Sequence, residues 1–392
     1  MPSPPRDGPT RHGDASVPPD GEPRLVPVGW DALAGWESDD HASALVALKR
    51  TARHVLANGP HKTGRLHAEL GGSGADFVPA LAASINADER FARVFFERWF
   101  APHAVGGSGL GGPDGGGLVT GFYEPTIQAS PERGEEYRYP IHAPPPDLRR
   151  NDGTLPAARD LPADHAWGIE RNGRLDPAPD RSAIEAGALL AAAPFRDWPV
   201  IAWAADRVDL YFAHIQGAAR LLMPDGSVRR VTYAAKSGHP FTGIGSVLRE
   251  RGALTEISMV TIRAWLAAHP DEADAVMRLN RSYIFFREEA VDDPVLGPVA
   301  AARVPLHPGR SLAVDRRLHG FGTPIHVHAP ALDWDGAPFS RLMIAQETGT
   351  AIVGAARGDI FTGSGEAAGD RAGGIVASAR FVALLPRAHA AP

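Results

Sequence analysis

The stretch from residue 295 to residue 387 constrains the fold of this chain most strongly. It holds many short apolar segments that are separated by glycine and proline. Short strands at this spacing predict a compact barrel or sandwich rather than a sheet built from βαβ units. Within the stretch, residues 341–365 begin as an apolar strand and then turn on glycine.

Three acidic residues lie in this β-rich stretch: Asp315, Glu347 and Asp359. Asp359 follows Glu347 by 12 residues, and each of the two stands beside a Gly-containing turn. Cleavage of a sugar bond needs an acid that protonates the leaving oxygen, and often a second carboxylate. Each acid also has a structural interpretation, in which Asp315 pairs with Arg316 or Arg317 and Asp359 only closes a turn. The residues alone leave both interpretations open.

Composition excludes several classes of function. The formal net charge of −6 argues against a nucleic-acid binder, which normally has a basic patch or a high pI. Because the chain has no cysteine, it has no disulfide, no thiolate nucleophile, no Cys-ligated zinc and no cysteine for a lipid anchor. No apolar run approaches the roughly 20 residues that cross a bilayer. Residues 1–24 lack the apolar core of a signal peptide and predict a disordered lead-in.

The remaining elements are predicted from periodicity and turn chemistry. Amphipathic helices are expected over 36–56 and 87–100, and a third helix over 258–268 with Ser258 as its N-cap. An Asp-Gly turn predicts a hairpin between strands at 220–223 and 228–233. Residues 131–181 are rich in Pro, Asp and Arg and predict a loop-rich insertion.

Several motifs point to no particular chemistry. The glycine-rich residues 106–117 superficially match GxGxxG, but no strand enters them and no helix follows, so a flexible loop is expected. His326 and His328 face one side of a strand without an evident third metal ligand. No serine elbow is present. His239 lies with Lys236 in a Gly-Pro loop that either lines a cleft or is solvated. We therefore expect neither a metal nor an organic cofactor.

Six motifs in a fixed order carry a resemblance to a known family. They are Thr120-Gly-Phe-Tyr-Glu-Pro125, Ile215-Gln-Gly217, Lys236-Ser-Gly-His-Pro240 with Ile244-Gly245, Ser282-Tyr-Ile-Phe-Phe286, Gly309-Arg-Ser-Leu-Ala-Val-Asp315, and Asp359-Ile-Phe-Thr-Gly-Ser-Gly365 with Arg371-Ala-Gly373. Together they resemble the membrane-bound lytic murein transglycosylase A (MltA) family over roughly residues 85–387. The C-terminal part resembles the three-aspartate (3D) domain.

The resemblance implies a mainly β protein with N-terminal helices and two domains. Residues 25–125 and 295–388 would form the helices and a double-psi β-barrel. Residues 126–294 would form an inserted β-rich domain, with a glycan groove between the two. Clefts at domain interfaces are common ligand sites.

The resemblance also implies a reaction: non-hydrolytic cleavage of the MurNAc–GlcNAc β-1,4 bond of peptidoglycan, which leaves a 1,6-anhydro-MurNAc end. The catalytic aspartate of the family corresponds to Asp359, which would act as acid and then as base. Its pKa should be raised by burial or by a nearby like charge, for which Glu347 is the candidate. Asp315 and Glu347 would support the site. The residues expected along the substrate groove are Tyr123, Glu124, Gln216, Lys236, Gly238 and His239.

This chain departs from the family pattern at several positions. The middle aspartate of the three is Glu347. The usual Asp-x-Gly-Gly-Ala-Ile-Lys-Gly stretch carries Thr350 in place of a glycine and Val353 in place of the lysine. Likewise, the usual Gln-Gly-Ser-Gly-Arg reads Gln216-Gly-Ala-Ala-Arg220. The lost lysine removes one positive charge or sugar hydrogen bond.

Three functions of different classes follow from these observations. The first is a monomeric lytic transglycosylase that acts on peptidoglycan glycan strands in the periplasm or at the outer membrane. The departures from the family pattern favour a second, a peptidoglycan-binding protein with weak or no catalysis. The third is a glycoside hydrolase with two carboxylates. A hydrolysed product carries one water more than an anhydro sugar, so the mass of the product separates the classes.

Overall fold

The computed structural model describes residues 22–106, 116–162, 165–188, 198–290 and 293–387. Six of its strands close into a barrel, in the order β17-β14-β15-β13-β16-β3, because β3 also pairs with β17. They are β3 (Gly117–Glu124), β13 (Ser311–Val314), β14 (Pro324–Trp334), β15 (Ala337–Glu347), β16 (Arg357–Ser364) and β17 (Val376–Pro386). The predicted barrel is thereby confirmed, although β14, β15 and β17 are longer than the short strands that were expected.

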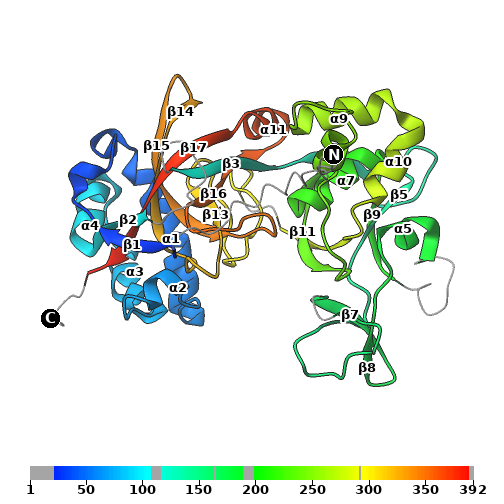
Figure 1. The fold of residues 1–392 in the computed structure, drawn as a ribbon, viewed down its shortest axis with the longest axis horizontal. Helices are drawn as coiled ribbons and strands as arrows, with labels where there is room; N and C mark the ends of the chain where they lie inside the picture. The colour runs from blue at the N-terminus through cyan, green and yellow to red at the C-terminus, as the bar shows by residue number, and fades with distance from the viewer. Residues whose placement is uncertain (1–21, 107–115, 163–164, 189–197, 291–292, 388–392) are drawn as a thin grey trace, which may run out of the picture.

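Helices from the N-terminal part cover one end of this barrel (Figure 1). They are α1 (His41–Asn58), α2 (Arg65–Ala68), α3 (Val78–Ile85) and α4 (Ala92–Trp99). Leu45 and Leu48 of α1 and Phe96 of α4 share one buried core with Ile325 and Phe339 of the barrel. Strands β1 (Arg24–Pro27) and β2 (Phe100–Gly106) extend the barrel sheet beyond β17.

Both predicted amphipathic helices are present but shorter than expected. Asp40 caps α1 by accepting a hydrogen bond from the Ser43 N–H, so the helix begins at His41 and only a 3-10 turn covers Trp36–Ser38. The second helix ends at Trp99, and Phe100 already belongs to β2. Apolar periodicity predicted the buried faces, whereas the ends depend on caps that periodicity does not encode.

A second sheet has the order β12-β11-β10-β4-β9-β5 and lies beside the barrel along the long axis of the molecule (Figure 1). Its strands are β4 (Thr126–Ser130), β5 (Tyr139–His142), β9 (Val200–Ala204), β10 (Ala218–Leu222), β11 (Val228–Lys236) and β12 (Ile284–Glu289). A small third sheet joins β6 (Leu148–Arg150), β7 (Trp167–Arg171) and β8 (Arg174–Asp176). The predicted β10–β11 hairpin is confirmed, whereas the expected loop-rich segment 131–181 contains β5 to β8.

Helices pack around this second sheet and at its contact with the barrel. They are α5 (Arg181–Ala183), α7 (Arg207–Gln216), α8 (Ile244–Glu250), α9 (Met259–Ala268) and α10 (Pro270–Arg278), and α11 (Glu366–Gly373) follows β16 of the barrel. Ser258 caps α9 as predicted. Met259 at the start of α9 packs against Ala368 and Ala372 of α11, which joins the two parts of the molecule.

The chain crosses between the barrel and the second sheet at a buried ionic cluster. Glu124 ends β3 and is only 1% exposed. It accepts hydrogen bonds from Arg220 of β10 (3.0 Å) and Arg230 of β11 (2.6 and 3.0 Å). Arg230 also donates to the Leu296 carbonyl, on the segment that returns to the barrel. The Glu124 carboxylate thus connects the end of β3 to the second sheet, and through Arg230 to the segment around Leu296.

Two sequence-based predictions lie largely outside the described residues: most of the lead-in over 1–24 and most of the glycine loop over 106–117. Within the described ranges, no helix combines the length and apolar character needed to cross a membrane.

Candidate active site

Four residues form one row across neighbouring strands of the barrel. Ala313 of β13 pairs with Glu347 of β15 on one side and with Asp359 of β16 on the other, and Asp359 pairs with Thr120 of β3. Directly paired residues point to the same face of a sheet. The neighbours of this row along the strands belong to the barrel core, among them Leu312, Val314 and Ile360. The row therefore faces away from the core, on the outer wall.

Asp359 occupies a crowded position in this row. The Thr120 hydroxyl donates a hydrogen bond to Oδ1 of Asp359, and Arg357 donates to the oxygen of the same hydroxyl at 2.7 Å. Burial raises the pKa of Asp359 to about 6, against the smaller opposing effects of the Thr120 hydrogen bond and the Arg357 charge. The side chain nevertheless keeps part of its surface accessible. The interpretation of Asp359 as a turn residue is wrong, because it lies inside β16.

Glu347 ends β15 and is held by backbone donors. Its carboxylate accepts hydrogen bonds from the N–H groups of Thr348 (2.8 Å) and Ala301 (3.2 Å). Burial raises its pKa to about 7 despite these hydrogen bonds. Glu347 is not among the groups that act on the pKa of Asp359. Burial, and not a like charge on Glu347, is therefore the cause of the raised pKa of Asp359.

Asp315 has the environment of a structural carboxylate. It accepts hydrogen bonds from the Arg317 backbone N–H, from Nε and Nη2 of Arg317, and from the Gly354 N–H. Burial opposes ionisation, but these hydrogen bonds outweigh it and lower the pKa of Asp315. The pair with Arg317 is the structural alternative that the sequence left open. Asp315 thus fixes the turn after β13 and the segment before β16.

Three expected groove residues lie at the contact between the barrel and the second sheet. Glu124 is buried with both oxygens engaged, so the expectation that it contacts a substrate does not fit this geometry. The Tyr123 ring packs on α11, and burial raises its pKa. Gln216 accepts a hydrogen bond from the Tyr123 N–H at 3.3 Å through its Oε1. These contacts stabilise the arrangement of the two sheets.

The remaining three groove residues lie in the segment that follows β11. Lys236 is half-buried, its pKa is lowered by burial, and it makes no ion pair within the described part of the chain. Gly238 has φ +88°, and a Cβ there would lie 2.3 Å from the Trp167 carbonyl, so only glycine fits. His239 is buried with Nε2 2.7 Å from the Ala178 carbonyl oxygen, which rules out a solvated loop. Among the described residues, Lys236 keeps an ammonium group without an ion pair, and His239 keeps a buried Nδ1 without a hydrogen-bond partner.

Sequence reasoning missed Thr120 and Arg357, the two residues bonded to each other beside Asp359. Thr120 is part of a quoted motif, but its role depends on pairing between strands 239 residues apart. Arg357 stands two positions before the acid. It lies just outside the quoted motif, which begins at Asp359.

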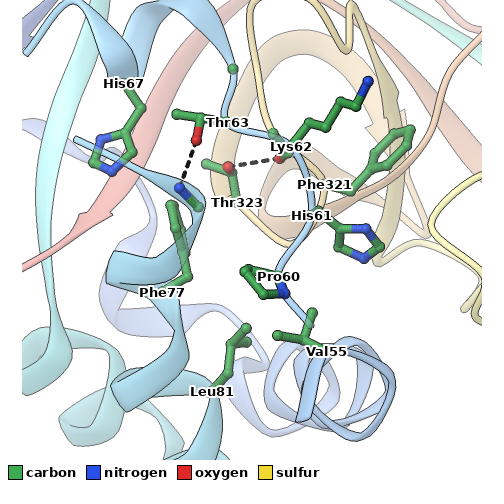
Figure 2. A pocket seen from close by; sticks show the side chains of 13 residues that line it. Val55, Pro60, His61, Lys62, Thr63, His67, Phe77, Leu81, Phe321 and Thr323 are labelled. Atoms are coloured by element: carbon green, nitrogen blue, oxygen red, sulfur yellow. Dashed lines mark hydrogen bonds between the residues drawn. The ribbon is translucent and has the colours of Figure 1, made fainter. Parts of the chain in front are cut away.

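A small hollow in the molecule shares no lining residue with this row. It has a volume of about 20 Å³ and is lined by residues of the N-terminal helices, of the segment between α1 and α2, and of the turn before β14, including His61, Thr63, Phe77 and Phe321 (Figure 2). This is room for about one water molecule, so the hollow cannot hold a sugar. No group of three or more potential metal ligands occurs among the described residues, and His326 and His328 form no such site.

Comparison with known proteins assigns the chain to a family. Residues 310–385 match the model of the 3D domain, which defines the barrel as a 3D-domain barrel. Residues 118–287 match the MltA specific insert domain. The chain belongs to the MltA family of lytic murein transglycosylases, and the resemblance drawn from its motifs is confirmed.

Individual relatives support the assignment over nearly the whole chain. The crystal structure of a membrane-bound lytic murein transglycosylase from Agrobacterium tumefaciens is 44% identical with a TM-score of 0.83, covering 93% of this chain and 98% of that one. Escherichia coli MltA with bound chitohexaose is 26% identical with a TM-score of 0.63, covering 97% and 99%. The curated membrane-bound lytic murein transglycosylase A of Escherichia coli K12 is 34% identical over 262 residues, or 65% of this chain. That match spans 61% of the relative's length.

Proposed function

We propose that this protein is a peptidoglycan lytic transglycosylase that cleaves the MurNAc–GlcNAc bond without water and leaves a 1,6-anhydro-MurNAc end. One observation carries the proposal: Asp359 is an accessible acid on the outer wall of the barrel, and burial raises its pKa to about 6. A carboxyl group of that pKa can be protonated before reaction and ionised after it.

The reaction needs only this one acid. Protonated Asp359 donates its proton to the glycosidic oxygen as the bond from C1 to that oxygen breaks. The C6 hydroxyl of the same MurNAc then attacks C1 and closes the anhydro ring. The Asp359 carboxylate accepts the C6 hydroxyl proton, which restores the acid. No water attacks, so no second carboxylate is needed to activate one.

The glycan strand would lie in a groove between two domains. One domain consists of residues 25–125 and 295–388, and the other consists of the inserted residues 126–294. The Escherichia coli relative holds chitohexaose, a β-1,4-linked sugar chain, which supports an extended saccharide site. Lys236 is the inserted-domain residue that we assign to substrate binding, because its ammonium group lacks an ion-pair partner in the described structure. We place the protein at the cell envelope, where its substrate lies, and propose that it acts as a monomer.

A two-carboxylate hydrolase is the second candidate, and the row on the barrel wall favours it specifically. Glu347 and Asp359 stand two strand spacings apart, with only the methyl group of Ala313 between them. Strands about 4.8 Å apart place their backbones roughly 10 Å from each other, which approaches the carboxylate separation of inverting glycosidases. Glu347 would then activate the water.

The mass of the product tests both candidates. Purified peptidoglycan is digested with the wild-type protein and with Asp359→Asn, and the soluble muropeptides are weighed by mass spectrometry. Anhydro ends from the wild type and none from the variant are expected. Products heavier by one water would replace the transglycosylase with the hydrolase. If the protein binds peptidoglycan but releases no soluble product, it is the non-catalytic peptidoglycan-binding protein. The departures from the family pattern favoured that function.

A further inference from the structure

The acid of the proposed site has an arginine two residues before it that makes no ion pair with any described carboxylate. Arg357 is half-buried. Its Nη2 donates to the Thr120 hydroxyl oxygen at 2.7 Å, and its Nη1 donates to the Gly358 carbonyl beside it. The guanidinium is therefore fixed at two points, against the strand that carries the acid and against the neighbouring strand.

The arrangement has a fixed hydrogen-bond direction. A guanidinium has only donors, so the Thr120 oxygen must accept from Arg357. The single hydroxyl hydrogen of Thr120 cannot return to Arg357 and is directed to Oδ1 of Asp359. Oδ1 is thus an acceptor in both ionisation states of the acid. When Asp359 is protonated, its proton must be on Oδ2, the oxygen that is not held by Thr120.

Other charged groups on the packed elements are already engaged or distant. Directly after β13, Asp315 is bound by Arg317, and on β3, Glu124 is bound by Arg220 and Arg230. Glu347 lies two strands away, and Arg371 of α11 pairs with Asp335. Arg357 is the one charged group that acts on the pKa of Asp359 within the described structure, and it lowers that pKa.

We propose that Arg357 is a positioning residue that acts through Thr120 to hold Asp359 with Oδ1 toward β3 and Oδ2 free to exchange a proton with the sugar. The inference rests on the proposed function, since it assigns a role in that same proton transfer. It assigns Arg357 no contact with the substrate. Its removal should therefore lower kcat and leave KM nearly unchanged.

The test compares three variants with the wild type by the release of anhydro-muropeptides between pH 4.5 and 8.5. Arg357→Met should lower kcat by about 10- to 100-fold, the scale of a misplaced catalytic group. It should also move the inflection of the pH profile to higher pH, because a positive charge that lowers the pKa of Asp359 is gone. Thr120→Val should also lower kcat and move the inflection to higher pH, because the Thr120 hydrogen bond that lowers the pKa of Asp359 is lost. Arg357→Lys keeps the charge, so its inflection should stay near the wild-type position while kcat remains reduced.

Arg380→Met is the matched control, because Arg380 is an exposed arginine on β17 of the same barrel and lies outside the site. It should leave both kcat and the inflection unchanged. A wild-type kcat and inflection in Arg357→Met would overturn the inference. The inference would also be overturned if Arg357→Met lost activity only in proportion to a fall in its melting temperature, while the inflection of its pH profile stayed at the wild-type position. Anhydro release by Asp359→Asn would instead overturn the proposed function, so the two failures are distinguishable.

Discussion

Glu347 and Asp359 lie on opposite sides of Ala313 in one row on the outer wall of the barrel. Both are acids with a raised pKa, and in both burial is the main cause. Their surroundings differ in the donors they receive: two backbone N–H groups for Glu347 and one hydroxyl for Asp359. Neither acid is among the groups that act on the pKa of the other, so each can be tested by itself.

The pH dependence of the reaction should follow Asp359. In the proposed reaction its acid form makes the first proton transfer, and its pKa is about 6. Below that pH the acid is protonated and the rate is maximal. Above it the protonated fraction, and with it the rate, falls about tenfold per pH unit. Initial rates of muropeptide release across pH 4.5–8.5 measure this profile. A rate that stays constant from pH 5 to pH 8 would contradict the assignment.

Replacement of Glu347 should leave that profile in place. In Glu347→Gln the amide oxygen can still accept a hydrogen bond from the Thr348 or the Ala301 N–H, and the charge that burial disfavours is gone, so stability at pH 8 should not fall. The inflection from Asp359 should not move, since Glu347 does not act on its pKa. Glu347→Asp, which restores the residue of the family pattern, serves as the matched variant. A loss of all product in Glu347→Gln, with Glu347→Asp active, would instead indicate the two-carboxylate hydrolase.

Removal of the Glu124 charge should weaken the junction between the sheets. Glu124→Gln leaves Arg220 and Arg230 without their buried counter-charge, which typically costs about 3–5 kcal/mol. Urea unfolding measures the change. Arg229→Gln is the control, because its pair with Glu288 lies near the surface, and such pairs contribute less than about 1 kcal/mol. Equal effects of the two substitutions would show that the buried cluster does not stabilise the junction.

Acid should destabilise the part of the protein that holds His142 and His214. Burial lowers the pKa of His142 to about 4 and that of His214 well below its usual value. Between the usual pKa of 6.5 and the lowered value, the unfolded chain binds protons that the folded chain does not. Stability is thus fully present above pH 6.5 and falls with acidification, by up to about 1.4 kcal/mol per pH unit for each histidine.

Melting temperatures between pH 7.5 and pH 4.5 measure this loss. His142→Gln retains a hydrogen-bonding side chain beside the Tyr283 hydroxyl but cannot titrate, so its melting temperature should vary less with pH than that of the wild type. An unchanged slope in this variant would assign the acid sensitivity to other groups.

The sequence predicted the elements whose signal is local. The Asp-Gly hairpin and the Ser258 cap were found because turn and cap chemistry involves adjacent residues. Closure of the barrel was predicted only through the family resemblance, since the β3–β17 pairing joins residues far apart in the chain.

The candidate site was predicted only in part for the same reason. Asp359 was identified by its motif, but its partner Thr120 could not be, because cross-strand register is a property of the folded barrel. Glu124 and His239 were assigned to the groove as polar residues within motifs. Their burial depends on Arg220, Arg230 and the Ala178 carbonyl, which no pattern near them indicates.

The hydrogen bond between Thr120 and Asp359 joins residues 239 positions apart, with the whole second sheet between them in sequence. During synthesis the ribosome must therefore pass residue 359 before this hydrogen bond can form, and β17 must follow before the barrel can close. The order of translation therefore delays assembly of the proposed acid site until β17 has been made.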